Sequence, residues 1–74
     1  MNITIQILDI DDNDRIKSDY TREYPDASTV ADILSHERIS SYEHLILVND
    51  QVKKSDTVLR NCDTVKLIPH IFGG

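Results

Sequence analysis

Most apolar residues in this chain repeat at every second position or form short runs, and they follow helical spacing in only one stretch. In residues 2–8, NITIQIL, Ile3, Ile5 and Ile7 alternate with polar side chains, which predicts a strand with one buried face. Residues 15–24 alternate between a charged face and a mixed face. Such a strand suits a sheet edge, where charge discourages pairing with other chains. The polar segment DIDDND between them is rich in turn formers, so the two segments predict an N-terminal hairpin.

The stretch with helical spacing lies in residues 28–37. It predicts a short helix docked on a sheet through one apolar face, formed by Val30, Ile33 and Leu34. Ser28 or Thr29 can cap this helix, because both offer a side-chain oxygen to the first free backbone N–H groups. With Thr29 as the cap, Asp32 falls three residues later, which is the spacing of a capping box.

The second half of the chain supplies further strands. Residues 45–49, LILVN, form a continuous apolar run of strand length, and we expect it to be buried on both faces or nearly so. After an Asn-Asp turn and the polar segment QVKKSDTVLR, residues 64–69 alternate again, with Ile68 on the face opposite Val65 and Leu67. Pro69 is expected to end this last ladder because it has no N–H donor. Together these elements predict an α+β roll with one helix on a sheet.

Composition restricts the partners more than it restricts the fold. The 74 residues suffice for one small domain, and the formal charge is −5, with nine acids against three bases in residues 1–37. Such a surface is a poor partner for nucleic acid or an anionic membrane, and it favours a protein partner of basic character. The N-terminus does not resemble a secretory signal, no segment is long enough to span a bilayer, and Cys62 is the single cysteine. We therefore expect a soluble cytoplasmic domain without a disulfide framework or a metal cluster.

Both glycines of the chain, Gly73 and Gly74, stand at its last two positions. Every earlier turn is therefore built without the residue that most easily adopts left-handed backbone conformations. A chain terminus makes no such demand from within the fold. The two glycines thus indicate a requirement that is imposed by a partner.

Three motifs are similar to those of a known family. STVADIL at residues 28–34 matches the family's helix start, LVND at 47–50 matches a strand that ends in Val-Asn or Ile-Asn, and DTVKLIPHIFGG at 63–74 matches the stretch that leads to Gly-Gly. Through these motifs the whole chain resembles the MoaD/ThiS family of ubiquitin-like sulfur carriers. That family includes the small subunit of molybdopterin synthase and the carrier for the thiamine thiazole. The resemblance implies a β-grasp roll over residues 1–70, a mixed sheet of four to five strands covered by one helix. Residues 71–74 would form a flexible Gly-Gly tail.

The resemblance also implies a chemistry. In the family, an activating enzyme uses ATP and Mg²⁺ to adenylate the C-terminal carboxylate, here that of Gly74. A sulfur nucleophile then displaces AMP and leaves a thiocarboxylate, which donates sulfur to an acceptor such as a synthase subunit. The chain itself would be a carrier and not an enzyme, with no permanently bound cofactor. Its partners would be the activating enzyme and the acceptor synthase subunit.

The other tail residues have roles that follow from this chemistry. Gly73 and Gly74 would let the backbone thread a narrow tunnel, because neither residue has a Cβ atom to obstruct it. Ile71 and Phe72 are interpreted as docking anchors that are buried only in a partner, and the alternative is that they fold back and cap the end of the core. Ile68 is expected to join an exposed apolar patch on the sheet that contacts the partner.

Two other functions remain open from the sequence. A ubiquitin-like modifier would use the same activated Gly74 carboxylate but transfer it to lysine amines. A plain β-grasp interaction module would have an accidental Gly-Gly end. The acceptor pathway is open as well, among molybdopterin, thiamine, tRNA thiolation and an amino-acid route. Pro69 resembles the molybdopterin carriers more than the thiamine carriers.

A calcium loop is a weaker interpretation of the N-terminal acids. Asp9, Asp11 and Asn13 have the D-x-D-x-N spacing that opens such a loop. Asp14 stands where the loop needs glycine, and Tyr20 stands where it needs glutamate. A solvated hairpin turn therefore explains these residues better.

Cys62 is interpreted as a turn cysteine and not as a sulfur relay. The family commonly has Gly-Asp where this chain has Cys62-Asp63, and we expect Asn61 to supply the left-handed conformation. Roughly 26 Å of strand separates Cys62 from His70, so the two cannot act as a nucleophile and its base. His36 and His44 are interpreted as exposed surface histidines.

Overall fold

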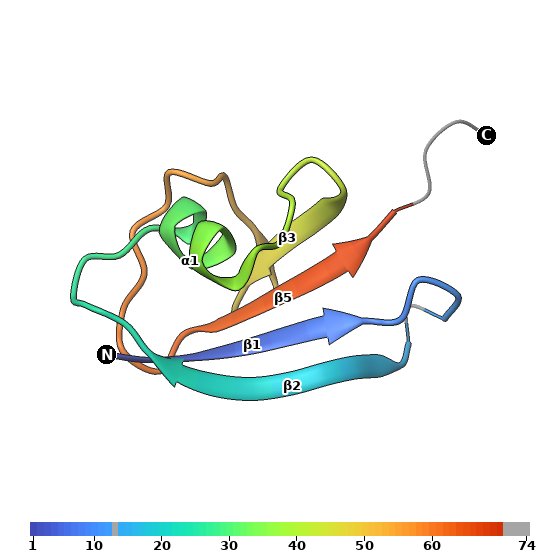
Figure 1. Ribbon diagram of the computed structural model, residues 1–74, viewed down its shortest axis with the longest axis horizontal. Helices are drawn as coiled ribbons and strands as arrows, with labels where there is room; N and C mark the ends of the chain where they lie inside the picture. Colours follow the sequence, from blue (N-terminus) through green and yellow to red (C-terminus); the bar gives the residue numbers. More distant parts are fainter. Residues whose placement is uncertain (13, 71–74) are drawn as a thin grey trace.

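A mixed sheet carries one helix on one of its faces (Figure 1). The computed structural model describes residues 1–12 and 14–70. In that part of the chain the elements are β1 (Asn2–Leu8), β2 (Ile16–Glu23), α1 (Val30–Glu37), β3 (His44–Val48), β4 (Gln51–Val52) and β5 (Thr64–Pro69). The five strands of this region lie in the order β2-β1-β5-β3-β4, with β1 and β5 parallel and the other neighbours antiparallel. This arrangement confirms the predicted mixed β-grasp sheet with one helix.

The N-terminal hairpin and the helix start follow the sequence pattern closely. β2 lies at a sheet edge, as its charged side chains predict. The capping box forms as expected, because the Thr29 hydroxyl accepts the Asp32 N–H and the Asp32 carboxylate accepts the Thr29 N–H. The helix ends at Glu37, and Arg38 then adopts a left-handed conformation that turns the chain towards β3.

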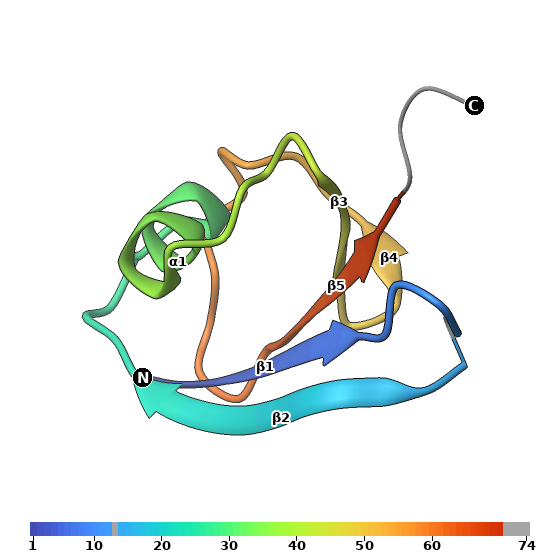
Figure 2. The ribbon, with the colours of Figure 1, turned by 45° about the vertical axis from the view of Figure 1, so that its right-hand side comes forward.

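The hydrophobic core lies between α1 and the face of the sheet that α1 covers, which we call the concave face. Figure 2 shows the helix above this face, near the end where β1 begins. Alternate residues of the central strands contribute Ile3 and Ile5 from β1 and their neighbours from β5 and β3. The buried side chains of the cluster are Ile3, Ile5, Tyr24, Val30, Ile33, Leu34, Ile46, Val48, Leu59, Val65 and Leu67. The period-two pattern therefore predicted the buried face of β1 and β5 correctly.

The prediction for residues 45–49 was wrong on one face. Ile46 and Val48 are buried as expected, but Leu45 is 41% exposed and Leu47 is half-buried. The apolar run continues on the face opposite α1, which we call the open face, and no described element covers that face at β3. The continuous apolar run therefore correctly indicated a strand with apolar side chains on both faces. Only the face under α1 is fully buried.

The turns use residues other than glycine in left-handed conformations. Asn49 and Asp50, with φ of 50° and 68°, form the tight turn between β3 and β4. At the turn before β5 it is Cys62, with φ of 70°, that is left-handed. The expectation for Asn61 was therefore wrong: its side-chain oxygen accepts the Asn2 N–H at 2.7 Å and ties this turn to β1.

The structure bears on membrane association in one respect. Within the described residues, no helix has the length and apolar character that crossing a bilayer requires.

Candidate functional site

β5 delivers the chain to its C-terminal segment from the middle of the sheet. It is hydrogen-bonded to β1 on one side and to β3 on the other (Figure 1). Beyond Pro69, the His70 N–H still donates to the Glu43 carbonyl oxygen at 3.1 Å. The His70 ring adds a hydrogen bond from Nε2 to the Tyr42 carbonyl oxygen at 3.2 Å. Pro69 ends β5, as predicted, but one further backbone bond holds the chain beyond it.

The predicted tail residues cannot be placed from the structure. Ile71, Phe72, Gly73 and Gly74 lie outside the described residues. The roles assigned to them, and the division into a 1–70 domain and a 71–74 tail, therefore remain predictions.

Ile68 lies where the sequence predicted, on the open face of the sheet. It pairs with Leu45 across the β3–β5 ladder, and Leu47 pairs with Val52 across the β3–β4 ladder. Leu45 and Val52 are exposed, whereas Ile68 and Leu47 are half-buried. These four side chains form what we call the open-face patch. It is an apolar surface next to the point where the chain leaves the sheet.

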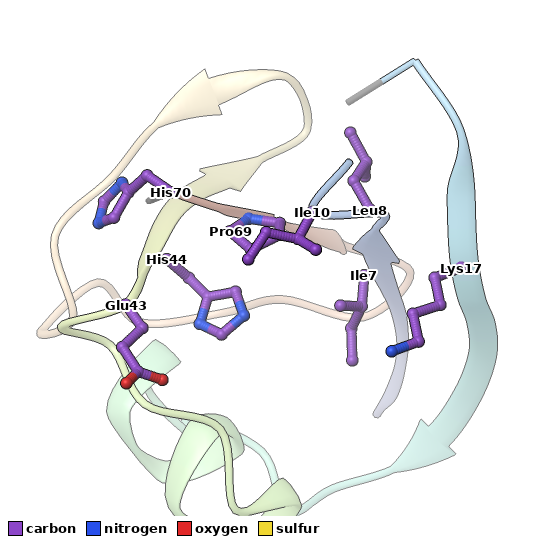
Figure 3. Close-up of a pocket in the computed structure, with 8 residues that line it drawn as sticks. All are labelled: Ile7, Leu8, Ile10, Lys17, Glu43, His44, Pro69 and His70. Atoms are coloured by element: carbon purple, nitrogen blue, oxygen red, sulfur yellow. The ribbon is translucent and has the colours of Figure 1, made fainter. Parts of the chain in front are cut away.

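A second apolar surface lies on the concave face at the same end of the sheet. It is a groove with a volume of about 470 Å³, and its apolar lining comes from Ile7, Leu8, Ile10 and Pro69. Its polar lining comes from Lys17, Glu43, His44 and His70, and Figure 3 shows Lys17 and Glu43 on opposite sides of the groove. We call it the tail-base groove. It lies beside the last described residues of the chain, and sequence reasoning did not find it, because its lining comes from four separate segments.

The strongest electrostatic feature of the described residues is a cluster around the Glu37 carboxylate. The Glu37 side chain is only 5% exposed, at the C-terminal end of α1. Tyr20 Oη donates to its Oε1 at 2.8 Å, Arg22 Nε contacts its Oε2 at 2.8 Å, and Tyr24 Oη donates to Oε2. His36 Nδ1 lies 3.2 Å from the same carboxylate. These five residues form what we call the Glu37 cluster.

The pKa values in this cluster follow from burial and hydrogen bonding. Burial by itself would raise the pKa of Glu37, but the hydrogen bonds from Tyr24, Tyr20, His36 and Arg22 outweigh it and lower that pKa to about 2. Burial, and then the hydrogen bond to Glu37, raise the pKa values of the Tyr20 and Tyr24 hydroxyls above their usual range. Glu37 is therefore ionised and both tyrosines are neutral near pH 7.

The Glu37 cluster connects the helix to the edge of the sheet. Tyr20 and Arg22 come from the edge strand β2, Tyr24 comes directly after it, and Glu37 ends α1, so the cluster ties the sheet edge to the helix. It lies where β2 ends and β1 begins, at the opposite end of these strands from the tail-base groove. The alternating mixed face of residues 15–24 was the sequence signal for it. The pattern could not identify Glu37 as the partner carboxylate, because Glu37 lies fifteen residues from Arg22 along the chain.

The remaining candidates form no catalytic or metal site in the part that the structure describes. Cys62 is exposed, and it lies at the opposite end of β5 from His70, as the sequence predicted. His36 is exposed, but its contact with Tyr24 and Glu37 was not foreseen. His44 is half-buried, and its Nδ1 donates to the Ser40 carbonyl oxygen at 2.8 Å. Within residues 1–12 and 14–70, no group of His, Cys, Asp or Glu side chains could hold a metal ion.

Comparison with known families identifies the lineage. The model of the ThiS family matches residues 10–74, from the turn after β1 through Gly74. The chain belongs to the ThiS family. Proteins of this family are non-catalytic sulfur carriers, so this ThiS-family chain is a carrier and not an enzyme. Carriers of this family bind no cofactor of their own, and membership implies an activating enzyme as a partner. No curated protein matches the ThiS-family chain in a direct comparison.

Proposed function

We propose that the Gly74 carboxylate of this carrier is adenylated by a partner enzyme and then converted to a thiocarboxylate. ATP supplies the AMP group and releases pyrophosphate, which gives the carboxyl carbon a good leaving group. A hydrosulfide-type nucleophile attacks that carbon and displaces AMP, so that one sulfur replaces one oxygen. The thiocarboxylate then donates sulfur in the biosynthesis of a cofactor of the molybdopterin or thiamine-thiazole type, in the cytoplasm. ATP and Mg²⁺ act in the partner's site.

The observation that carries this proposal is the family match, which extends over Gly73 and Gly74. The geometry is compatible with it. β5 is held on both sides, and its exit at Pro69 and His70 is fixed by bonds to the Tyr42–Glu43 segment. Four further residues can extend roughly 13 Å from this exit, enough to enter the active site of another protein.

The open-face patch lies next to the exit of the chain, and Ile71 and Phe72 follow that exit in the sequence. We propose that the activating enzyme contacts Ile68 within the patch and uses Phe72 as an anchor, because apolar and aromatic side chains at the centre of an interface carry most of the binding energy. The acceptor synthase subunit would use the same exit after sulfur has been loaded. Phe72→Ala should therefore raise the KM for adenylation. The comparison is made in an Ile10→Ser background, so that any binding of Phe72 to the carrier's own surface does not contribute, and an unchanged KM there would contradict the anchor role.

The decisive experiment incubates the full chain with a candidate activating enzyme, ATP, Mg²⁺ and sulfide, and then measures its intact mass. The proposal predicts exchange of one oxygen for one sulfur at the C-terminus. A variant that lacks Gly73 and Gly74 should show no exchange and serves as the control. Conjugates linked to lysine amines in cell lysate, in the absence of any thiocarboxylate, would instead establish a ubiquitin-like modifier.

A further inference from the structure

The helix is too short to cover the whole concave face of the sheet. α1 has eight residues and so a length of about 12 Å. β1 has seven residues and extends about 23 Å, so one end of its concave face is left over. On β1 and β5 the residues that continue the buried row past Ile5 and Leu67 are Ile7 and Pro69. They line the tail-base groove and lie beyond the helix.

The lining of this groove favours an apolar occupant. Ile10, from the loop after β1, is 52% exposed and lines the groove together with Pro69 (Figure 3). The groove has a volume of about 470 Å³, which lies within the range of ligand pockets, roughly 300–1,000 Å³, and is ample for one aromatic side chain. Four of the eight lining residues are apolar, namely Ile7, Leu8, Ile10 and Pro69, and the other four are Lys17, Glu43, His44 and His70. The rings of His44 and His70 are already hydrogen-bonded to the carbonyl oxygens of Ser40 and Tyr42, so they are not aimed at a ligand in the groove.

The chain itself supplies an aromatic residue soon after the residues that line the groove. Pro69 and His70 line the groove, and four residues of the sequence follow them. Phe72 is the single phenylalanine of the chain and is two residues beyond His70, a span of roughly 7 Å when extended. Its aromatic side chain suits an apolar lining, and it follows closely on two residues that line the groove themselves.

We propose that, in the free carrier, the Phe72 side chain binds the tail-base groove and holds the Gly-Gly end against the carrier's own surface. The groove and its occupant are independent of the sulfur chemistry. The consequence for activation rests on the function proposed above: the activating enzyme must displace Phe72 before Gly74 can enter its site. Only the carrier with a released tail would be competent. The apparent dissociation constant for the enzyme then rises by the inverse of the released fraction.

The binding is tested by NMR of the free, full-length protein with labelled Ile and Leu methyl groups. We expect NOEs between the Phe72 ring protons and the Ile10 and Leu8 methyl groups. In Phe72→Ala these methyl resonances should lose an upfield ring-current shift, whereas those of Ile33, in the core under α1, should not move. Ile10→Ser should abolish the NOEs to Leu8. Val58→Ser, which alters an aliphatic residue of similar exposure (57%) outside the groove, should preserve them.

Three results would overturn the proposal. Methyl shifts that are identical in the wild type and in Phe72→Ala would show that the groove does not bind Phe72. Shifts that depend on protein concentration would assign the groove to a second copy of the chain. Shifts that appear only when the activating enzyme is added would assign it to the partner.

A kinetic measurement, the apparent KM for adenylation, distinguishes this inference from the proposed function. If Phe72 occupies the groove half of the time, Ile10→Ser should lower the apparent KM for adenylation about twofold, with Val58→Ser unchanged. NOEs in the free protein without any adenylation would support the groove and refute the function. Adenylation without NOEs in the free protein would support the function and refute the binding of Phe72 to the groove.

Discussion

Replacing Glu37 with glutamine should remove a share of the stability that depends on pH. The substitution preserves the shape of the side chain but removes the charge that Tyr20, Arg22 and Tyr24 contact. The pKa of Glu37 falls from its usual 4.5 to about 2 in the folded protein. At about 1.4 kcal/mol per unit this difference corresponds to roughly 3 kcal/mol. Arg22 is 54% exposed and its contribution is screened by water, so we expect a loss of about 2 kcal/mol near pH 7.

The sign of the pH dependence follows from the lowered pKa of Glu37. A carboxylate with a lower pKa in the folded state stabilises the fold above its unfolded pKa of 4.5. This contribution is lost as the pH falls from 4.5 towards 2, because the folded state must then take up the proton against its hydrogen bonds. At pH 3, less than about half of the stabilisation from the ionised Glu37 carboxylate remains. The difference in free energy of unfolding between wild type and Glu37→Gln should shrink accordingly.

Urea unfolding followed by far-UV circular dichroism at pH 6.5 and pH 3 measures this difference. A loss of about 2 kcal/mol would lower the Tm of a domain of this size by about 8–16 °C. Glu23→Gln makes the same chemical change at an exposed residue of β2 and is the matched control. The reasoning fails if Glu37→Gln costs no more than Glu23→Gln, or if its cost is the same at both pH values.

Three further changes test separate parts of the structure. Tyr24→Phe removes the hydroxyl that donates to Glu37 and should cost about 1.5–3 kcal/mol in urea unfolding, and an unchanged Glu37 pKa in an NMR titration would contradict the assigned hydrogen bond. Cys62→Gly should raise the free energy of unfolding by up to about 1 kcal/mol, because it relieves a left-handed conformation with φ of 70°. It should leave adenylation and sulfur loading unchanged, and a loss of loading would revive the sulfur relay. Leu45→Ser, in the open-face patch, should raise the KM for adenylation several-fold with a small effect on Tm, and equal kinetics for Leu45→Ser and Val58→Ser would exclude the patch as a partner surface.

The elements that could be predicted from the sequence are those fixed by local spacing. The alternation of Ile3, Ile5 and Ile7 reports the buried face of β1, and the Thr29-Asp32 pair reports the start of α1, because both patterns act within a few residues. The exposed side of Leu45 could not be predicted, because it depends on which face of the sheet the single helix covers. A periodic pattern identifies a face but not what lies against it.

The candidate surfaces show the same difference between local and long-range information. The Gly-Gly end and the position of Ile68 could be found from one segment of the chain. The Glu37 cluster and the tail-base groove could not, because each combines residues from segments that meet only after folding: Arg22 with Glu37, and Ile10 with Pro69. The left-handed residue before β5 was assigned to Asn61 on intrinsic preference. In the structure Cys62 is left-handed, and the Asn61 side chain accepts a hydrogen bond from the Asn2 N–H of β1, a contact that local preference does not report.

The central place of β5 has a mechanical consequence. A pull on the chain beyond Pro69, such as a partner would exert under the proposed function, acts along a strand with hydrogen-bonded neighbours on both sides. The load falls on both ladders in shear, so that many bonds share it at once. It does not open them one after another, as it would in a strand peeled from an edge. The fold should therefore resist unfolding when force is applied at its C-terminal end.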